Sequence, residues 1–172
     1  MRLGVISDTH DQIERTRFAV KLLRDAGAEV VVHCGDVVEP ELIAEFAGQP
    51  FYFTFGNNDA DTVPGLRRAI NEIGGACLEW GGEVVLAGKR IAITHGHMRT
   101  DVRRLLAAKP DYLLSGHSHI ASDHRDGSLR RINPGALYRA SKYTVALLDL
   151  ATDLVTFHTI PRRPEGRRVS GG

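Results

Sequence analysis

Short apolar runs alternate with amphipathic segments over the first half of the chain. Three such runs occupy 3–7, 30–34 and 51–55. Their continuous Val, Ile, Leu and Phe content is typical of strands that are buried on both faces of a sheet. Residues 12–26 carry apolar side chains at helical spacing, with Asp11 as the predicted N-cap and Gly27 just past the predicted end. This pattern predicts a β-α-β unit, whose two strands are parallel.

Strand patterns dominate the second half of the chain. The remaining predicted elements are helices at 39–46, 65–73 and 98–108, hairpins at 83–94 and 122–132, a buried strand at 112–115, and an antiparallel pair at 143–149 and 155–160. The second hairpin contains Asp126-Gly127, a favoured two-residue turn. We therefore expect one mixed sheet and a second, mostly antiparallel sheet, packed face to face with helices outside.

Length and composition indicate a single soluble domain. The 172 residues suit one full-sized core, which we expect at 1–160, and no apolar run is long enough to span a membrane. Residues 161–172, rich in Pro, Gly, Arg and Ser, are predicted to be a disordered tail. A net charge of +1 offers no basic face for nucleic acid. Cys34 and Cys77 lack metal or redox spacing, so we expect a buried thiol at Cys34 and a cytoplasmic location.

Five islands of Asp, Asn and His each stand where a predicted strand ends. They are Asp8-Thr9-His10, Gly35-Asp36, Gly56-Asn57-Asn58-Asp59, His95-Gly96-His97 and Gly116-His117-Ser118-His119. Any one of them alone is compatible with an ordinary turn or helix cap. Because strand ends in an open α/β sheet point at one crevice, we expect the islands to converge there. Carboxylates, imidazoles and a carboxamide suit hard-to-borderline metals, and there are enough ligands for two ions.

In this order, the islands resemble the motifs of the calcineurin-like metallophosphoesterase superfamily. The short length and Asn133-Pro134-Gly135 resemble its small prokaryotic phosphodiesterase branch. The resemblance implies an α/β fold, a four-layer α/β/β/α sandwich of two mixed β-sheets flanked by helices, with a dinuclear metal centre at one rim. The implied ligands are Asp8, His10 and His119 for one metal, Asn57, His95 and His117 for the other, and Asp36 as the bridge. This donor set suits Mn²⁺, Ni²⁺, Fe²⁺ or Zn²⁺, and Mn²⁺ is expected first because the family is commonly Mn-dependent.

The family also implies the reaction, which is hydrolysis of a phosphate ester by in-line attack of a metal-bridging hydroxide. Besides Asp36, the residue at position 58 bears on catalysis: many members carry a His there that protonates the leaving oxygen, whereas this chain has Asn58. General acid catalysis contributes about 10²–10⁴-fold, so we expect a phosphodiesterase that favours esters with good leaving groups. His97 is a candidate phosphate contact or proton donor, and Asp59 is expected to orient a ligand.

Two alternatives remain open. The same chemistry would serve a phosphomonoesterase or a nucleotide phosphatase, and the fold resembles the eukaryotic retromer subunit, a scaffold that has lost metal-site residues. All seven implied ligands remain here, which disfavours the scaffold. The expected partner is a small phosphate ester. Arg99, Arg103 and Arg139 are candidates for binding its phosphate, although a solvated helix face explains the first two equally well. An exposed strand edge would also permit a homo-oligomer, in line with the frequent self-association of small-branch proteins.

Overall fold

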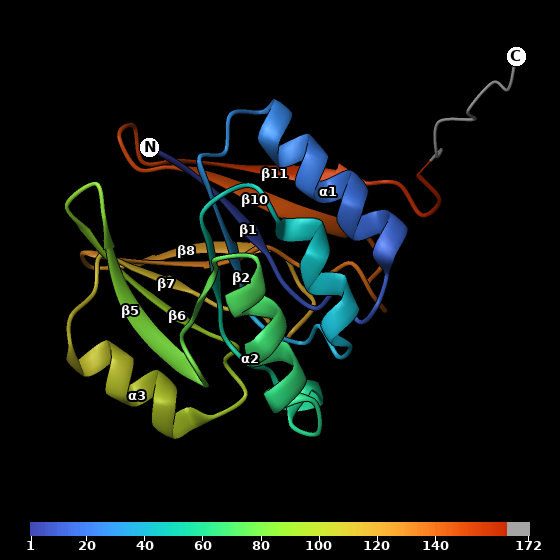
Figure 1. The fold of residues 1–172 in the computed structure, drawn as a ribbon. Coiled ribbons are helices and arrows are strands. Elements are labelled where there is room, and N and C mark those ends of the chain that lie inside the picture. The colour runs from blue at the N-terminus through green and yellow to red at the C-terminus, as the bar shows by residue number, and fades with distance from the viewer. Residues whose placement is uncertain (165–172) are drawn as a thin grey trace, which may run out of the picture.

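Two β-sheets lie face to face at the centre of the fold, and helices cover the outer faces (Figure 1). The structure is a computed structural model and describes residues 1–164. Residues 165–172 of the predicted tail lie outside the described residues. Within residues 1–164, no helix combines the length and apolar character needed to cross a membrane.

The first sheet has six strands in the order β11-β10-β1-β2-β3-β4. Their bounds are β1 Arg2–Ile6, β2 Val30–His33, β3 Phe51–Phe53, β4 Ala76–Cys77, β10 Tyr143–Asp149 and β11 Leu154–Ile160. Strands β1 to β4 are parallel, whereas β10 pairs antiparallel with both β1 and β11. The outer face of this sheet carries α1 (Ile13–Asp25), α2 (Val63–Glu72) and a 3₁₀ helix, η1 (Pro40–Phe46). This confirms the predicted β-α-β unit and the mixed character of the sheet.

The second sheet has five strands in the order β5-β6-β7-β9-β8. Their bounds are β5 Gly81–Leu86, β6 Lys89–Thr94, β7 Tyr112–Leu114, β8 Ser122–Asp126 and β9 Leu129–Asn133, and α3 spans Arg99–Ala107. The prediction of a mostly antiparallel sheet is wrong here. Both hairpins formed, but β5 and β8 took the two edges, so β6, β7 and β9 run parallel in the middle. The four-layer sandwich of two mixed sheets is confirmed.

Three apolar layers hold the four structural layers together. Between the sheets, Leu3 and Val5 of β1 pack with Ile93 of β6 and their neighbours. Outside the first sheet, the helices bury side chains such as Leu23 and Phe46 against it. A smaller cluster, in which Leu105 of α3 meets Ala92 and Leu113, covers the second sheet. The sandwich is therefore closed on both faces, and its polar chemistry is left to the rims.

Local signals at the start of α1 differ from the prediction. Gln12 occupies the N-cap position, so the assignment of Asp11 is wrong. Asp11 has a left-handed φ of 57°, and its carboxylate accepts the backbone N–H of Glu39 at 2.9 Å. Asp11 therefore joins two loops instead of capping the helix. At the other end, Gly27 with a φ of 87° follows the C-cap Ala26, as predicted.

One buried carboxylate joins the loops that follow β2 and β3. Asp59 lies in a short 3₁₀ helix, η2 (Asn57–Asp59), and is fully buried. It accepts backbone N–H groups from Asp36 and Val37 at 2.9 Å, from Val38 at 2.8 Å and from Gly56 at 2.7 Å. Hydrogen bonds to a charged acceptor are stronger than neutral ones, so Asp59 fixes the path of the backbone that carries Asp36.

Replacing Asp59 by Asn tests this role. The substitution keeps the shape but turns one acceptor oxygen into an NH₂ group that faces backbone N–H donors. We expect the free energy of unfolding to fall by about 2–4 kcal/mol, because buried donors lose a charged acceptor. Urea unfolding of Asp59→Asn, with the exposed Asp61→Asn as control, measures the effect. Equal stability of the two variants would contradict the assigned role.

Candidate metal centre

The five islands meet at one rim of the sandwich. Asp8, Asp36 and Asn57 follow the parallel strands β1, β2 and β3, and the histidine pairs follow β6 and β7 of the other sheet. Hydrogen bonds join the two sheets at this point: the Nδ1 atom of His95 lies 2.7 Å from the carbonyl oxygen of Cys34, and the His117 N–H donates to Asp8 Oδ2 at 3.0 Å. The convergence expected from strand order is therefore present.

An open cavity of about 340 Å³ lies at this rim. Its lining residues are His10, Asp36, Asn57, Asn58, His117, His119, Tyr138 and Arg139. Five of the seven predicted metal ligands are in this set. The other two, Asp8 and His95, are fully buried and contact members of the lining. All seven thus belong to one site.

Donor atoms gather in two groups that share a carboxylate. Those of Asp8, His10 and His119 lie within 4.8 Å of one another, and so do those of Asp8, Asp36 and His95. The first group is the set predicted for one metal. The second places Asp8 beside both positions, whereas the sequence assigned it to one. The His117 ring centroid lies 5.1 Å from that of His95, beside the second group.

Two imidazoles are oriented so that a lone pair faces the carboxylates. A carbonyl oxygen accepts hydrogen bonds only, so Nδ1 of His95, 2.7 Å from Cys34 O, carries the hydrogen. In the neutral ring, Nε2 then keeps its lone pair and lies 3.3 Å from Asp36 Oδ2. His119 repeats the arrangement, with Nδ1 3.4 Å from the carbonyl oxygen of Arg139 and Nε2 3.1 Å from Asp8 Oδ1. Anchoring the outer nitrogen in this way is typical of metal-binding histidines.

Several inward-facing atoms in this cluster have no hydrogen-bond partner in the described part of the chain. They are Asp8 Oδ1, His10 Nε2 and His95 Nε2, all buried. Unpaired buried polar atoms are costly, so a group that satisfies several at once stabilises the site. Divalent cations coordinated by nitrogen and oxygen fit these residues.

The pKa shifts in this cluster also indicate that it favours positive charge beside its buried carboxylates. Burial opposes ionisation of Asp36, but the nearby His10 and His95 rings and the backbone N–H of Asn58 hold its pKa well below its usual range. Burial likewise disfavours the charged form of His95, but the adjacent Asp36 carboxylate, with the charge of Asp8, raises the pKa of His95. Both shifts favour a positive charge beside the carboxylates, which a bound cation would supply.

The backbone of the islands is strained. Positive φ angles occur at Asp8 (53°), His10 (40°), Asp36 (62°), His117 (69°) and His119 (58°). Non-glycine residues in this region cost about 1–3 kcal/mol each and cluster at functional sites. Two glycines allow the tight approach: a Cβ at Gly56 would lie 2.1 Å from Asp36 Oδ1, and one at Gly116 would lie 1.8 Å from Ser7 Oγ.

The other predicted site residues occupy three different places. Asn58 lines the cavity and donates its backbone N–H and its side-chain Nδ2–H to the Asp36 carboxylate, at 2.8 and 2.7 Å. His97 does not line it; its half-buried ring lies 5.3 Å from the His95 ring and edge-on to Trp80 at 6.0 Å, both measured between centroids. Burial and the neighbouring His95 lower the pKa of His97. Asp59 stands behind the Asp36 loop and faces its backbone.

His33 connects two of the islands from beneath. Its Nδ1 accepts the Gly35 N–H at 3.1 Å, so Nε2 carries the hydrogen and donates it to Thr9 Oγ1, also at 3.1 Å. Burial lowers the pKa of His33 to about 3, which keeps the ring neutral. His33 is a hydrogen-bonded core residue, and it braces the loops that carry His10 and Asp36.

The Asn-Pro-Gly segment braces the histidines after β7. Asn133 Nδ2 donates to Gly116 O at 2.7 Å and to Ser118 Oγ at 3.1 Å, and Asn133 Oδ1 accepts the Gly135 N–H at 2.9 Å. The chain then leads to Tyr138, whose ring centroid lies 4.7 Å from that of His10. Sequence analysis missed Tyr138, because its only signal is the short distance along the chain from Asn133.

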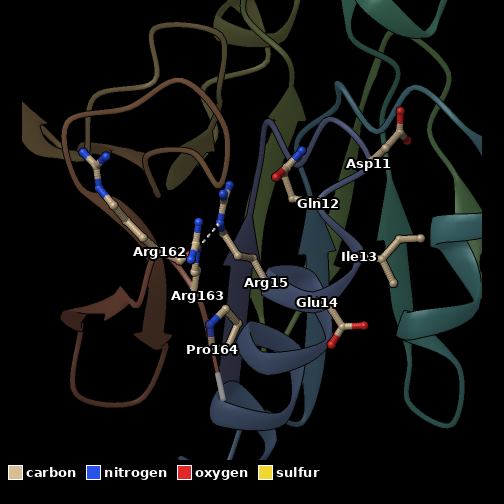
Figure 2. A pocket seen from close by; sticks show the side chains of 8 residues that line it. All are labelled: Asp11, Gln12, Ile13, Glu14, Arg15, Arg162, Arg163 and Pro164. Carbon is tan, nitrogen blue, oxygen red and sulfur yellow. Dashed lines mark hydrogen bonds between the residues drawn. The ribbon is translucent and has the colours of Figure 1, made fainter. Parts of the chain in front are cut away.

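A larger cavity, of about 540 Å³, lies over the first turn of α1 (Figure 2). Its lining comprises residues 11–15 and 162–164. Arg15 Nε donates to the carbonyl oxygen of Arg162 at 3.1 Å, so the first residues of the predicted tail contact the domain. This cavity contains no histidine and none of the predicted metal ligands, so it is not the candidate centre.

Comparison with known proteins agrees with this geometry. Residues 1–153 match the family model of the calcineurin-like phosphoesterase superfamily domain. Phosphodiesterase MJ0936 of Methanocaldococcus jannaschii is 29% identical over 155 residues, which cover 87% of this chain and 93% of that protein. The solved structure of an archaeal phosphodiesterase has a TM-score of 0.84 at 27% identity, covering 92% of this chain and 99% of the other.

A zinc complex of Vps29 from Entamoeba histolytica has a TM-score of 0.64 at 16% identity, covering 92% of this chain and 91% of the other. At that identity the likeness concerns the fold alone. The family match, in contrast, spans most of the chain and includes every island at the rim. The chain therefore belongs to the calcineurin-like phosphoesterase superfamily, whose members hydrolyse phosphoric esters with divalent metal ions.

Proposed function

We propose that this protein is a phosphodiesterase that depends on two divalent metal ions at the rim site. The observation that carries the proposal is the convergence of seven nitrogen and oxygen ligands, several with unpaired atoms facing one another. When bound, such a pair of cations supplies Lewis acidity toward phosphate oxygens and an activated water. The chain itself supplies the ligands, their orientation and the walls of the cavity.

Asp36 is proposed as the shared ligand. Its Oδ2 lies 3.5 Å from His10 Nε2 and 3.3 Å from His95 Nε2, and these histidines belong to opposite halves of the predicted ligand set. The two hydrogen bonds from Asn58 fix the plane of the carboxylate. Under this proposal, Asp8, His10 and His119 complete one site, and Asn57, His95 and His117 complete the other. The mixed donors suit Mn²⁺ first, with Ni²⁺, Fe²⁺ or Zn²⁺ as alternatives.

Position 58 supports a diester over a monoester as the substrate. A carboxamide is not a useful proton donor, and its Nδ2–H already bonds Asp36. His97, the other candidate acid, lies against Trp80 and outside the lining of the cavity. A small diester with a stable leaving group therefore suits this site better than an alkyl monoester. The phosphodiesterase name of the archaeal relative points the same way.

The remaining parts of the proposal concern setting and alternatives. The thiols of Cys34 and Cys77 are free, which suits a reducing compartment, and we propose the cytoplasm. A scaffold role like that of the retromer subunit is disfavoured, because a scaffold has no need of a complete and strained ligand set. Phosphomonoesterase or nucleotide phosphatase activity is the second candidate, and a substrate panel decides between them.

Removing Asp36 or the metals tests the function. With Mn²⁺ present, we expect hydrolysis of bis(p-nitrophenyl) phosphate to exceed that of p-nitrophenyl phosphate, very little hydrolysis of methyl phosphate, and no activity after chelation. Asp36→Ala should lower kcat by more than about 100-fold. Loss of a residue that only hydrogen-bonds a metal ligand already costs about 10–100-fold, and Asp36 is proposed as a ligand itself. Asp61→Ala, an exposed substitution, serves as control. A clear preference for the monoester, or full activity of Asp36→Ala, would overturn the proposal.

Restoring a proton donor at position 58 tests the substrate preference. Asn58 is exposed at the cavity, so Asn58→His places an imidazole there without disturbing the apolar core. The substitution also removes the hydrogen bond from Asn58 Nδ2 to Asp36, and Asn58→Gln controls for that loss. We expect kcat on alkyl phosphate monoesters to rise by up to about 10²-fold, because general acid catalysis becomes available. Steady-state kinetics on methyl and p-nitrophenyl phosphate would show the gain mainly for the methyl ester, with Asn58→Gln as control. An equal gain for both esters would argue against a missing acid.

A further inference from the structure

One wall of the metal-site cavity carries two side chains that have no role in the proposed function so far. Residues 136–142 connect the Asn-Pro-Gly turn to β10, and within this loop Tyr138 and Arg139 line the cavity. They face the same cavity as Asn57 and Asn58, which come from the loop after β3. A substrate in the cavity would therefore lie against both.

The backbone of this loop is held by the predicted metal ligands themselves. The Leu137 N–H donates to Asp8 O at 3.1 Å, and the carbonyl oxygen of Arg139 accepts from His119 Nδ1 at 3.4 Å. On the other side, Arg15 donates to the Leu137 carbonyl oxygen at 2.5 Å. Arg139 adopts a left-handed φ of 43°. Position 139 is thus fixed relative to the metal ligands although its side chain is exposed.

Tyr138 forms a platform between a predicted ligand and the arginine. Its ring centroid lies 4.7 Å from that of His10, and the guanidinium carbon of Arg139 lies 5.0 Å from the Tyr138 ring centroid. Attraction between a cation and an aromatic face favours this placement of Arg139 and reduces the number of rotamers that it samples. The guanidinium is therefore preorganised beside the cavity.

The charge of Arg139 is also available. Several other arginines are paired, such as Arg67 with Glu79 at 2.8 Å and Arg90 with Glu83 at 2.9 Å. Within residues 1–164, Arg139 forms no ion pair with a carboxylate. Arg99 and Arg103, the other candidates from the sequence, are exposed on α3 and do not line the cavity. The structure thus selects one of three arginines.

We propose that Arg139 binds non-bridging oxygens of the substrate phosphate and that Tyr138 positions its guanidinium. The planar fork of arginine matches two phosphate oxygens, and its charge stabilises the negative charge that develops during hydrolysis. Arginine does not release a proton at neutral pH, so Arg139 strengthens phosphate binding without replacing the missing acid. Because this role rests on the proposed function, its test includes a binding measurement that is independent of turnover.

The test compares Arg139→Gln with Arg103→Gln in the Mn²⁺-loaded protein. We expect Arg139→Gln to lower kcat/KM for bis(p-nitrophenyl) phosphate by about 10–100-fold and to weaken binding of inorganic phosphate, measured by calorimetry, by about tenfold. Metal content by mass spectrometry should not change, and Arg103→Gln should resemble the wild type. Arg139→Lys, which keeps the charge but loses the fork, should lie between wild type and Arg139→Gln.

Substitutions of Tyr138 test the platform separately. Tyr138→Phe keeps the aromatic face and should leave phosphate affinity within about twofold, whereas Tyr138→Leu should weaken it several-fold. Equal phosphate affinity of Tyr138→Leu and wild type would overturn the positioning role.

The outcomes separate this inference from the proposed function. Diester hydrolysis unchanged in Arg139→Gln, with unchanged phosphate affinity, would overturn the inference alone. Weaker phosphate binding in Arg139→Gln, combined with a wild type that hydrolyses no diester, would support Arg139 and contradict the phosphodiesterase proposal. A wild type that neither binds phosphate nor hydrolyses diesters would overturn both.

Discussion

The negative charge of Asp8 and Asp36, held out of water at the rim, constrains the rest of this structure. Both side chains are almost fully buried, and the cluster offers them imidazoles and backbone N–H groups instead of solvent. The surrounding features serve that arrangement: carbonyl oxygens orient His95 and His119, and Asp59 fixes the loop beneath Asp36. Buried carboxylates attract cations, and bound cations in turn attract the negative charge of a phosphate.

Much of this arrangement follows from local sequence signals. Parallel strands bring their carboxyl ends to one edge, so islands that follow strands must meet, and a buried strand is visible as a continuous apolar run. The strand order of the second sheet could not be predicted from the sequence, because β7 pairs with β9 and not with β8, the next strand along the chain. The direction of a single ring is equally hidden. His95 and His97 share one short island and their rings are neighbours, yet His95 faces Asp36, whereas His97 lies outside the lining of the cavity, beside Trp80. Asp11 and Tyr138 were misjudged or missed because their partners, Glu39 and His10, lie in other loops.

The comparison with Vps29 shows why the fold does not decide the function. This chain shares its sandwich fold with an archaeal phosphodiesterase at 27% identity and with Vps29 at 16% identity. A shared fold does not by itself imply a shared function. Within a shared fold, function is decided by the side chains of the site. In this chain all seven predicted metal ligands meet at the rim. The backbone is strained at five of them, namely Asp8, His10, Asp36, His117 and His119. Such strain clusters at functional sites, and binding of a cation there would offset its cost.

The hydrogen bond from His95 to Cys34 crosses from one sheet to the other at the place where both sheets supply ligands. A cation held there would link the two sheets, which otherwise pack together mainly through apolar contacts. Ions that bind only the folded state raise its stability by mass action, so resistance to heat should track the supply of metal in the surroundings. The same cations would then serve both catalysis and stability, and a shortage of metal would destabilise the fold as well as abolish hydrolysis.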